Sequence, residues 1–367
     1  MANRMLLGLG CAVCAAGQPG AAGDLDLASL VRPVPARAVF REPGSHVWCC
    51  TLTKGDDGRY HIFYARWPLE RHHRAWVTHS EVAHGVGDSP LGPFRFRDVA
   101  LPARGAPFWD GSCTHNPSVF RGRDRRYYLY HMGNVGDGQD VVPLNMVHRN
   151  NQRIGVAIAD SPDGPWQRFD RPALDVSADP TAPDALMVSN PAVCERPEGG
   201  YLMIYKGVSK PTPERPRGVV SFFVATADQP QGPFRKNLRE VMSEAQVGVT
   251  TEDPCLWRGA DRYWCIMRLN GTARRRDDGG WRFDRDGKSL ALFESFDGLD
   301  WRPARHAHIV DLRMRWAGDL ALRPICIERP QIYLEDGRPT VLICASTEQA
   351  RNVDGSFDIF IPLRDGL

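Results

Sequence analysis

The sequence lacks an excess of charge of one sign, and it lacks any long hydrophobic run. Forty-six lysines and arginines stand against 44 aspartates and glutamates, which leaves a net charge of only +2. Nucleic-acid-binding proteins usually carry a clear basic excess or a basic stripe, so a nucleic-acid partner is not expected. No apolar stretch reaches the roughly 20 residues that a membrane-spanning helix needs, and a stable membrane span is not expected either.

The sequence also lacks a recognisable cofactor motif. It contains no zinc, nucleotide or haem signature, and the spacing of its ten cysteines fits no small disulfide scaffold or metal knuckle. No metal and no cofactor are therefore predicted. Most of the cysteines from Cys49 to Cys344 lie in apolar, strand-like segments, where cysteine behaves as a small buried hydrophobe. Free buried thiols are the expectation.

The first 23 residues are typical of an export signal. Arg4 supplies a positive charge, Met5 to Ala16 form a short apolar region, and Ala21-Ala22-Gly23 offers small residues for cleavage. We predict a signal peptide over 1–23 and a mature protein that is periplasmic or secreted. Lipoprotein anchoring at Cys11 is less favoured, because Gly8 stands three residues before it.

The feature that organises the rest is a motif that returns four times, in which a polar residue and Pro open an apolar run. Its prolines lie 74, 63 and 76 residues apart, and the four copies are Thr114–Val119, Val188–Val193, Thr251–Leu256 and Ile327–Ile332. Strand-like segments follow each copy: 127–131, 201–205, 263–267 and 340–345. Third strands are predicted at 155–159, 222–226 and 290–294. A similar unit without the Pro motif precedes them, with strands predicted at 47–50, 60–64 and 76–80.

Five sequential units of short strands, with few long helical patterns between them, indicate radial repetition. We predict an all-β fold, a single five-bladed β-propeller over 24–367, with a large β-sandwich as the alternative. The expected blades span 38–104, 105–175, 176–243, 244–306 and 307–367. The last unit shows only three strand candidates, so the segment Leu30–Phe40 is expected to fill its missing edge and close the ring.

Candidate functional residues lie at the starts of the inner strands, which face the central channel of a propeller. The residues directly before Pro are Asn116, Asn190, Asp253 and Arg329, and those one position earlier are His115, Ser189, Glu252 and Glu328. Asp110 and Asp184 each lie six residues before one of the asparagines. Several acids and a histidine in one pocket could protonate a leaving group and activate water. As the plain alternatives, pre-proline Asn and Asp commonly cap turns, and Glu328 could form a structural ion pair with Arg329.

Other candidates suit a sugar ligand. Trp48 offers an aromatic face on which a sugar ring could stack, and Arg153 and Lys206 could bind a carboxylate or sulfate on an acidic sugar. Core packing of Trp48 and surface exposure of the two basic residues are the alternatives. A single ion in the central channel, held by His and carboxylate oxygens, stays possible without support from the spacing.

The Ser-Pro-x-Gly-Pro-aromatic turns, as in Ser161–Trp166, and the Asp-Pro and Glu-x-Pro strand openings resemble the five-bladed propeller glycoside hydrolases. That group includes family 43, the invertase and levansucrase families (32 and 68) and family 117, and the likeness extends to bacterial sequences described only as glycoside hydrolase family proteins. The resemblance implies a catalytic or stabilising carboxylate at Asp253 and a general acid at Glu328, while Glu252 also fits the acid pattern. The sequence departs from the family at the openings of the first three blades, where Ser45-His46-Val47, His115-Asn116 and Ser189-Asn190 replace the expected acids.

The resemblance predicts an exported glycoside hydrolase that acts on an oligo- or polysaccharide. Glu328 or Glu252 would protonate the glycosidic oxygen, and Asp253, Asp110 or Asp184 would act as the base or tune the acid. His115 would share proton transfer or, with Asn116, Asn190 and Arg329, bind the sugar. Inversion is the outcome that the resemblance favours. A glycoside phosphorylase and a non-catalytic carbohydrate-binding propeller are the alternatives, and the pattern indicates no oligomeric state.

Overall fold

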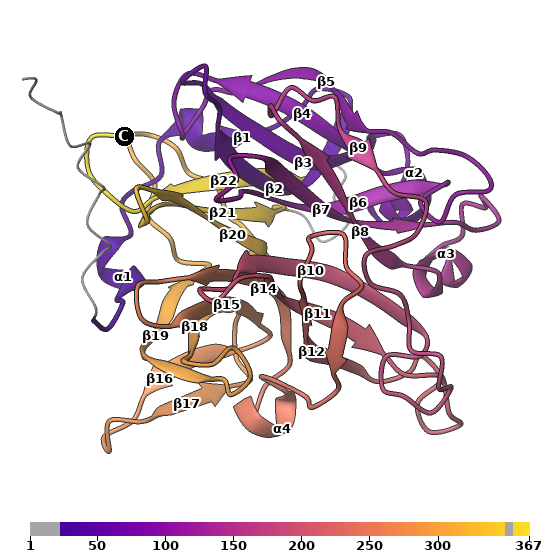
Figure 1. Cartoon of the computed structure of the whole chain (residues 1–367). Coiled ribbons are helices and arrows are strands. Elements are labelled where there is room, and N and C mark those ends of the chain that lie inside the picture. The colour runs from indigo at the N-terminus through magenta and orange to yellow at the C-terminus, as the bar shows by residue number, and fades with distance from the viewer. Residues whose placement is uncertain (1–22, 349–354) are drawn as a thin grey trace, which may run out of the picture.

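The computed structural model describes residues 23–348 and 355–367, so the expected signal sequence and Cys11 lie outside the described residues except for Gly23. Within the described ranges the strands form five four-stranded antiparallel sheets and one two-stranded hairpin. Figure 1 shows the five sheets arranged around one axis as the blades of a propeller. The all-β, five-bladed prediction is confirmed.

Within each of the first four blades the strands follow chain order from the axis outwards. The first blade contains β2 (Ser45–Lys54), β3 (Tyr60–Pro68), β4 (Glu81–Gly87) and β5 (Arg95–Leu101). The second contains β6 (Cys113–Arg121), β7 (Tyr127–Asn134), β8 (Arg153–Ala159) and β9 (Gln167–Arg168). The third contains β10 (Met187–Glu195), β11 (Tyr201–Val208), β12 (Val220–Ala227) and β13 (Arg235–Asn237). The fourth contains β14 (Thr251–Arg258), β15 (Tyr263–Leu269), β18 (Ser289–Ser295) and β19 (Arg302–Asp311).

The fifth blade joins the two ends of the described chain. It contains β20 (Glu328–Glu335), β21 (Arg338–Ser346), β22 (Phe357–Pro362) and the N-terminal β1 (Val39–Phe40). Val39 pairs with Ile359 and Phe40 with Asp358, so the expected closure by the segment Leu30–Phe40 occurs through its last two residues. Pairing satisfies the backbone groups of β22 that would otherwise form an open edge.

Short elements connect the strands. They are α1 (Leu27–Leu30), η1 (Ala36–Ala38), η2 (His73–Ala75), α2 (Trp76–His79), α3 (Met146–Asn150), α4 (Glu244–Val247) and the hairpin β16 (Thr272–Arg275) with β17 (Trp281–Asp284). None of the helices in the described residues is long and apolar enough to cross a membrane.

Two local predictions were wrong. The segment Trp76–Ser80 was expected to be a strand, but Ser80 N–H donates to the Trp76 carbonyl over 3.3 Å, which closes a helical turn, and β4 supplies the third strand. The expected boundary between residues 306 and 307 falls inside β19, because this strand pairs with β18 as far as the Ser289–Asp311 pair.

The core consists of apolar side chains packed between neighbouring blades. Tyr130 and Val156 of the second blade pack in one buried cluster with Tyr205 and Phe223 of the third. Burying a side chain of this size contributes about 1.5–3 kcal/mol. The eight cysteines between Cys49 and Cys344 are all buried free thiols, as expected for small hydrophobes in strands.

Candidate active site

The site begins with a backbone feature that all five blades share. Each innermost strand contains one residue with a left-handed backbone: Cys49 (φ 62°), Asn116 (φ 52°), Asn190 (φ 52°), Asp253 (φ 59°) and Arg329 (φ 51°). The pairing of each inner strand with its neighbour shifts register at this residue. A bulge of this kind re-aims a side chain, and a non-glycine residue keeps such a conformation only where its surroundings enforce it.

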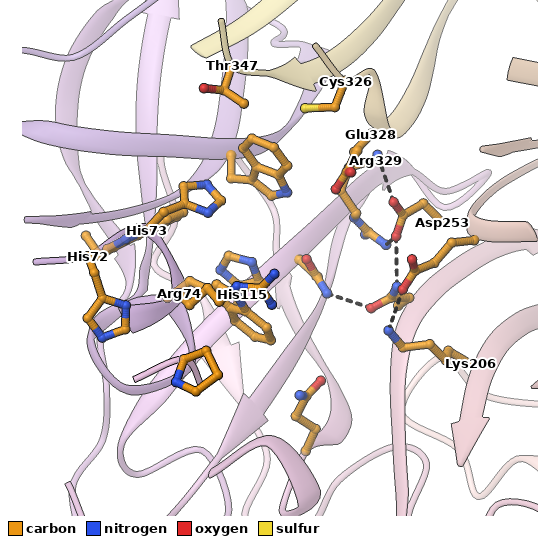
Figure 2. Close-up of a pocket in the computed structure, with 18 of the residues that line it drawn as sticks. His72, His73, Arg74, His115, Lys206, Asp253, Cys326, Glu328, Arg329 and Thr347 are labelled. Atoms are coloured by element: carbon orange, nitrogen blue, oxygen red, sulfur yellow. Dashed lines mark hydrogen bonds and ion pairs between the residues drawn. The ribbon is translucent and has the colours of Figure 1, made fainter. Parts of the chain in front are cut away.

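These five residues form a chain of hydrogen bonds across the propeller axis. Cys49 Sγ donates to Asn116 Oδ1 (2.9 Å), and Asn116 Nδ2 donates to Asn190 Oδ1 (2.7 Å). Asn190 Nδ2 then donates to Asp253 Oδ1 (2.9 Å), while the Arg329 backbone N–H donates to Asp253 Oδ2 (3.1 Å). We call these five residues the axial floor; Figure 2 shows part of it as dashed lines. The side-chain amides of Asn116 and Asn190 and the backbone N–H of Arg329 are therefore hydrogen-bonded within the floor.

The floor also corrects the alignment of the first blade. The inner strand of this blade was expected to open at Ser45-His46-Val47, but its bulge lies between Trp48 and Thr51. Trp48 and Cys49 therefore occupy the places that Glu252 and Asp253 occupy in the fourth blade. The Pro that marks this place elsewhere is replaced by Cys50.

A cavity of about 690 Å³ opens above the floor at the end of the axis where the inner strands begin. Its lining includes most of the candidates from the sequence: Trp48, His115, Asn116, Asn190, Lys206, Glu252, Asp253, Glu328 and Arg329. A second cavity, of about 740 Å³, is lined by the far ends of the same strands. The first is the better candidate, because three acidic residues and His115 converge there, and its volume suits a small ligand.

Two cations, Lys206 and Arg268, bind the glutamates of the first cavity. Arg268 Nη1 donates to Glu328 Oε1 over 3.0 Å, and its Nη2 pairs with Glu252 Oε2. Lys206 Nζ donates to the other oxygen of Glu252 over 2.9 Å. The two glutamates therefore lie on either side of one guanidinium group, while Lys206 contacts only one of them.

This environment separates the proton affinities of the two glutamates. Burial by itself would raise the pKa of Glu252, but the charges of Lys206 and Arg268 outweigh it and hold that pKa well below its usual range. Burial raises the pKa of Glu328, and the nearby carboxylates of Asp253 and Glu252 add to the effect against the opposing charge of Arg268. Glu328 therefore holds its proton to a higher pH than Glu252 does.

Aromatic and basic side chains form the opposite wall, as Figure 2 shows for His72, His73, Arg74 and His115. The His115 ring stacks on Trp76 with 4.6 Å between ring centroids, and its Nδ1 lies 2.8 Å from Ser80 Oγ. Burial, with the nearby charge of Arg329, lowers the pKa of His115 well below its usual value. A neutral His115 suits hydrogen bonding better than the delivery of a proton.

Asp110 and Asp184 do not line the cavity, which corrects the expectation that one of them completes the acid set. Asp110 is fully buried and binds Arg104 (2.6 Å) and Arg168, and burial would raise its pKa but for His131 and these arginines, which hold it low. Asp184, also fully buried, accepts from Lys236 Nζ (2.6 Å) and Tyr205 Oη (2.9 Å).

The two acids share a structural role in their blades. The Asp110 side chain lies against Gly133 of β7, and that of Asp184 against Gly207 of β11, so closely that a Cβ on either glycine would come within 2.6 Å of it or less. Arg153 likewise lies outside the cavity, where it pairs with Asp175 and donates to the Gln152 carbonyl. It is not placed to bind a ligand in this cavity.

The sequence did not point to several residues of the cavity, namely Trp67, His72, His73, Arg74, Trp76, Val142, Pro143, Gln152, Lys288, Ile325, Cys326 and Thr347, nor to Arg268 behind the two glutamates. One signal was available for Arg268. In the strand register, Lys206 of β11 lies opposite Ser189 of β10, and Arg268 of β15 lies opposite Glu252 of β14. The two cations therefore occupy the same position in consecutive repeats. An alignment of second strands would have placed a second cation beside the acids.

No protein-family model matches the sequence. No curated protein matches it either. Solved structures do share its fold. One is Zg3597, a family 117 glycoside hydrolase of the marine bacterium Zobellia galactanivorans, with a TM-score of 0.59, 15% identity and coverage of 89% of each chain. Another is a thermostable family-43 glycoside hydrolase, with a TM-score of 0.54, 12% identity and coverage of 90% of this chain and 91% of that one.

A third is the endo-arabinase of Bacteroides thetaiotaomicron VPI-5482, with a TM-score of 0.55, 10% identity and coverage of 91% of this chain and 98% of that one. At identities this low the likeness is one of fold. The chain has the five-bladed propeller architecture of these glycoside hydrolases over nearly all of its described length.

Proposed function

We propose that this protein is a glycoside hydrolase that uses Glu328 as the general acid and Glu252 as the ionised partner. The observation that carries the proposal is the position of the two glutamates on either side of Arg268. Their surroundings shift the pKa of Glu252 downward and that of Glu328 upward. Two carboxyl groups with separated pKa values are what hydrolysis of a glycosidic bond needs. The fold shared with glycoside hydrolases supports the same reading.

In this mechanism protonated Glu328 donates its proton to the glycosidic oxygen as that bond breaks. Ionised Glu252 accepts a proton from the attacking water, and Lys206 and Arg268 keep it ionised at neutral pH. We propose inversion of the anomeric configuration, by the resemblance to most propeller glycosidases. Asp253 accepts hydrogen bonds from Asn190 and Arg329 in the axial floor, so we assign it the positioning of the floor instead of the role of base.

The substrate that suits the cavity carries a negative charge. Arg74 and Lys288 line it, and neither has a hydrogen-bond or ion-pair partner among the described residues. Lys206 is already engaged by Glu252, so the two unpartnered cations are the ones available to a ligand. We propose that they bind a carboxylate or sulfate group of an acidic sugar, while Trp48 and Trp76 offer aromatic faces for its ring.

The same cations favour one second candidate, a glycoside phosphorylase, because phosphate is also bound by clustered arginine, lysine and histidine. The two candidates differ in one requirement. A phosphorylase cleaves the bond only when inorganic phosphate is present and yields a sugar phosphate, whereas a hydrolase needs water alone. A binding-only propeller would give no product under either condition.

The test is a screen of the full chain against acidic and neutral oligosaccharides of plants and algae, with and without phosphate, in which product anomers are followed by NMR. The matched control is the Glu252→Gln, Glu328→Gln double variant, which keeps the size of both side chains. We expect wild-type protein to release sugar without phosphate and the double variant to release none. Equal release by both proteins would refute the assignment of the two glutamates.

We also propose that the protein is exported to the periplasm or the medium, on the pattern of Arg4, the apolar residues after it and the small residues up to Gly23. Expression of the full chain in a bacterial host, followed by fractionation and N-terminal sequencing, tests this. A mature protein that starts near residue 24 supports export, and an intact Met1 in the cytoplasm contradicts it.

A further inference from the structure

Outside the candidate active site, two buried histidines of the first blade face each other. His61 on β3 and His84 on β4 expose 0% and 1% of their surface, and His61 Nδ1 lies 2.9 Å from His84 Nε2. The outer nitrogen of each ring faces a carboxylate. His61 Nε2 lies 3.3 Å from Asp57 Oδ1, and His84 Nδ1 lies 3.3 Å from Asp98 Oδ1.

Two neutral rings cannot donate to both carboxylates and to each other at the same time. An ionised carboxylate only accepts hydrogen bonds, so Asp57, which also accepts the Arg59 backbone N–H over 3.0 Å, and Asp98 each favour an N–H on the outer nitrogen of the ring they face. A neutral imidazole carries one N–H, which leaves both inner nitrogens as lone pairs that confront each other. An extra proton or a metal ion between His61 Nδ1 and His84 Nε2 lets both rings donate to their carboxylates at the same time.

The surrounding charges favour an ion with two positive charges. A third carboxylate, that of Asp163 in the second blade, has its Oδ1 3.8 Å from His61 Nδ1. Arg97 is the cation of the cluster, with its Nε 3.2 Å from Asp163 Oδ1 and 4.0 Å from Asp98 Oδ2. Three carboxylates and one guanidinium leave about −2 in charge beside the two rings, and this charge attracts a divalent cation more strongly than a single proton, although water screens the partly exposed carboxylates.

The donor atoms also suit a transition metal. A nitrogen of each histidine and an oxygen of Asp163 all lie within 4.8 Å of one another, and imidazole with carboxylate is a donor set that Zn²⁺ accepts. Bonds of about 2.05 Å in a tetrahedral site place two nitrogens about 3.3 Å apart. His61 and His84, whose rings are now nearly parallel at an angle of 12°, would separate by about 0.4 Å and turn so that both lone pairs point at the ion. Metal-binding histidines usually donate their other N–H to a carboxylate, as Asp57 and Asp98 allow here.

We propose that His61, His84 and Asp163 bind one divalent transition-metal ion, Zn²⁺ by preference, that joins the first two blades. Asp57 and Asp98 are positioning residues for the two rings. Asp163 keeps 36% of its side chain exposed, so water can complete the coordination sphere and the ion can enter from solvent. The role of this ion is structural, and the proposal is independent of the glycosidase assignment.

The test is metal binding by the full chain after treatment with a chelator and buffer exchange. We expect titration with ZnCl₂ to show one tight site per chain and a rise in Tm, and Co²⁺ to give the visible absorption of a tetrahedral site. Asp163→Asn, at a partly exposed side chain, should fold and bind Zn²⁺ at least tenfold more weakly. His84→Gln should abolish binding.

His73→Gln is the matched control, because it removes a histidine of the active-site cavity and should leave Zn²⁺ affinity unchanged. Wild-type protein that binds no Zn²⁺ at micromolar concentrations would overturn the proposal, and the gap would then hold a proton. So would Asp163→Asn protein with wild-type affinity, or binding that His73→Gln removes.

Discussion

The difference in pKa between Glu252 and Glu328, to which Lys206 and Arg268 contribute, gives the sharpest prediction. Lys206 contacts Glu252 alone, whereas Arg268 contacts both Glu252 and Glu328. An opposite charge at this distance lowers a carboxyl pKa by about 1–3 units. Lys206→Gln should therefore raise the pKa of Glu252 by about that amount and leave Glu328 nearly unchanged. Arg268→Gln should raise both.

The assay is the pH dependence of kcat/KM on a substrate found by the screen. Activity rises with pH as Glu252 loses its proton and falls as Glu328 loses its own. Lys206→Gln should move the acidic limb to higher pH by about 1–3 units and leave the basic limb in place, while Arg268→Gln should move both limbs upward. A Lys206→Gln profile whose basic limb moves, or whose two limbs stay fixed, would refute the assignment of Glu252 as the ionised partner.

Asp253→Asn leaves the buried Arg329 without its counter-charge, so the free energy of unfolding should fall by about 3–5 kcal/mol in a denaturant titration. Arg74→Ala and Lys288→Ala should each raise KM for an acidic oligosaccharide about tenfold with little change for a neutral one, and equal effects on both sugars would count against an anionic substrate. Asp110→Asn should destabilise the fold, measured as a lower Tm, but leave the pH profile of the folded enzyme unchanged; a shifted profile would restore it as a catalytic candidate.

The recurrent Pro motif made the fold and the centre of the site predictable. Pro cannot donate a hydrogen bond within a sheet, so its return at a strand start marks the same bulge in four blades. From that alone Glu252, Asp253, Glu328 and His115 were expected in one cavity, and the structure brings them together. The first blade has Cys50 where the others have Pro, and the prediction of its opening was three residues too early.

What the sequence did not reveal depends on side-chain partners from distant strands. The matching positions of Asp110 and Asp184 reflected a real repeat, but Arg168 on β9 and Lys236 on β13 convert both acids into buried structural pairs. The sequence left open which of Glu252 and Glu328 is the general acid for the same reason. Lys206 and Arg268 lower the pKa of Glu252 against the effect of burial, whereas burial and two neighbouring carboxylates raise that of Glu328, and these surroundings exist only in the folded chain.

The most direct measurement is the rate of Glu328→Gln on two substrates that share a sugar and differ in leaving group. A general acid contributes about 10²- to 10⁴-fold, so turnover of a natural oligosaccharide should fall by that order. An aryl glycoside with an activated leaving group needs little protonation, and its turnover should be largely kept, whereas Glu252→Gln should be slow on both substrates because the water lacks its base. Full activity of Glu328→Gln on the oligosaccharide, or selective rescue of Glu252→Gln by the activated leaving group, would contradict the account.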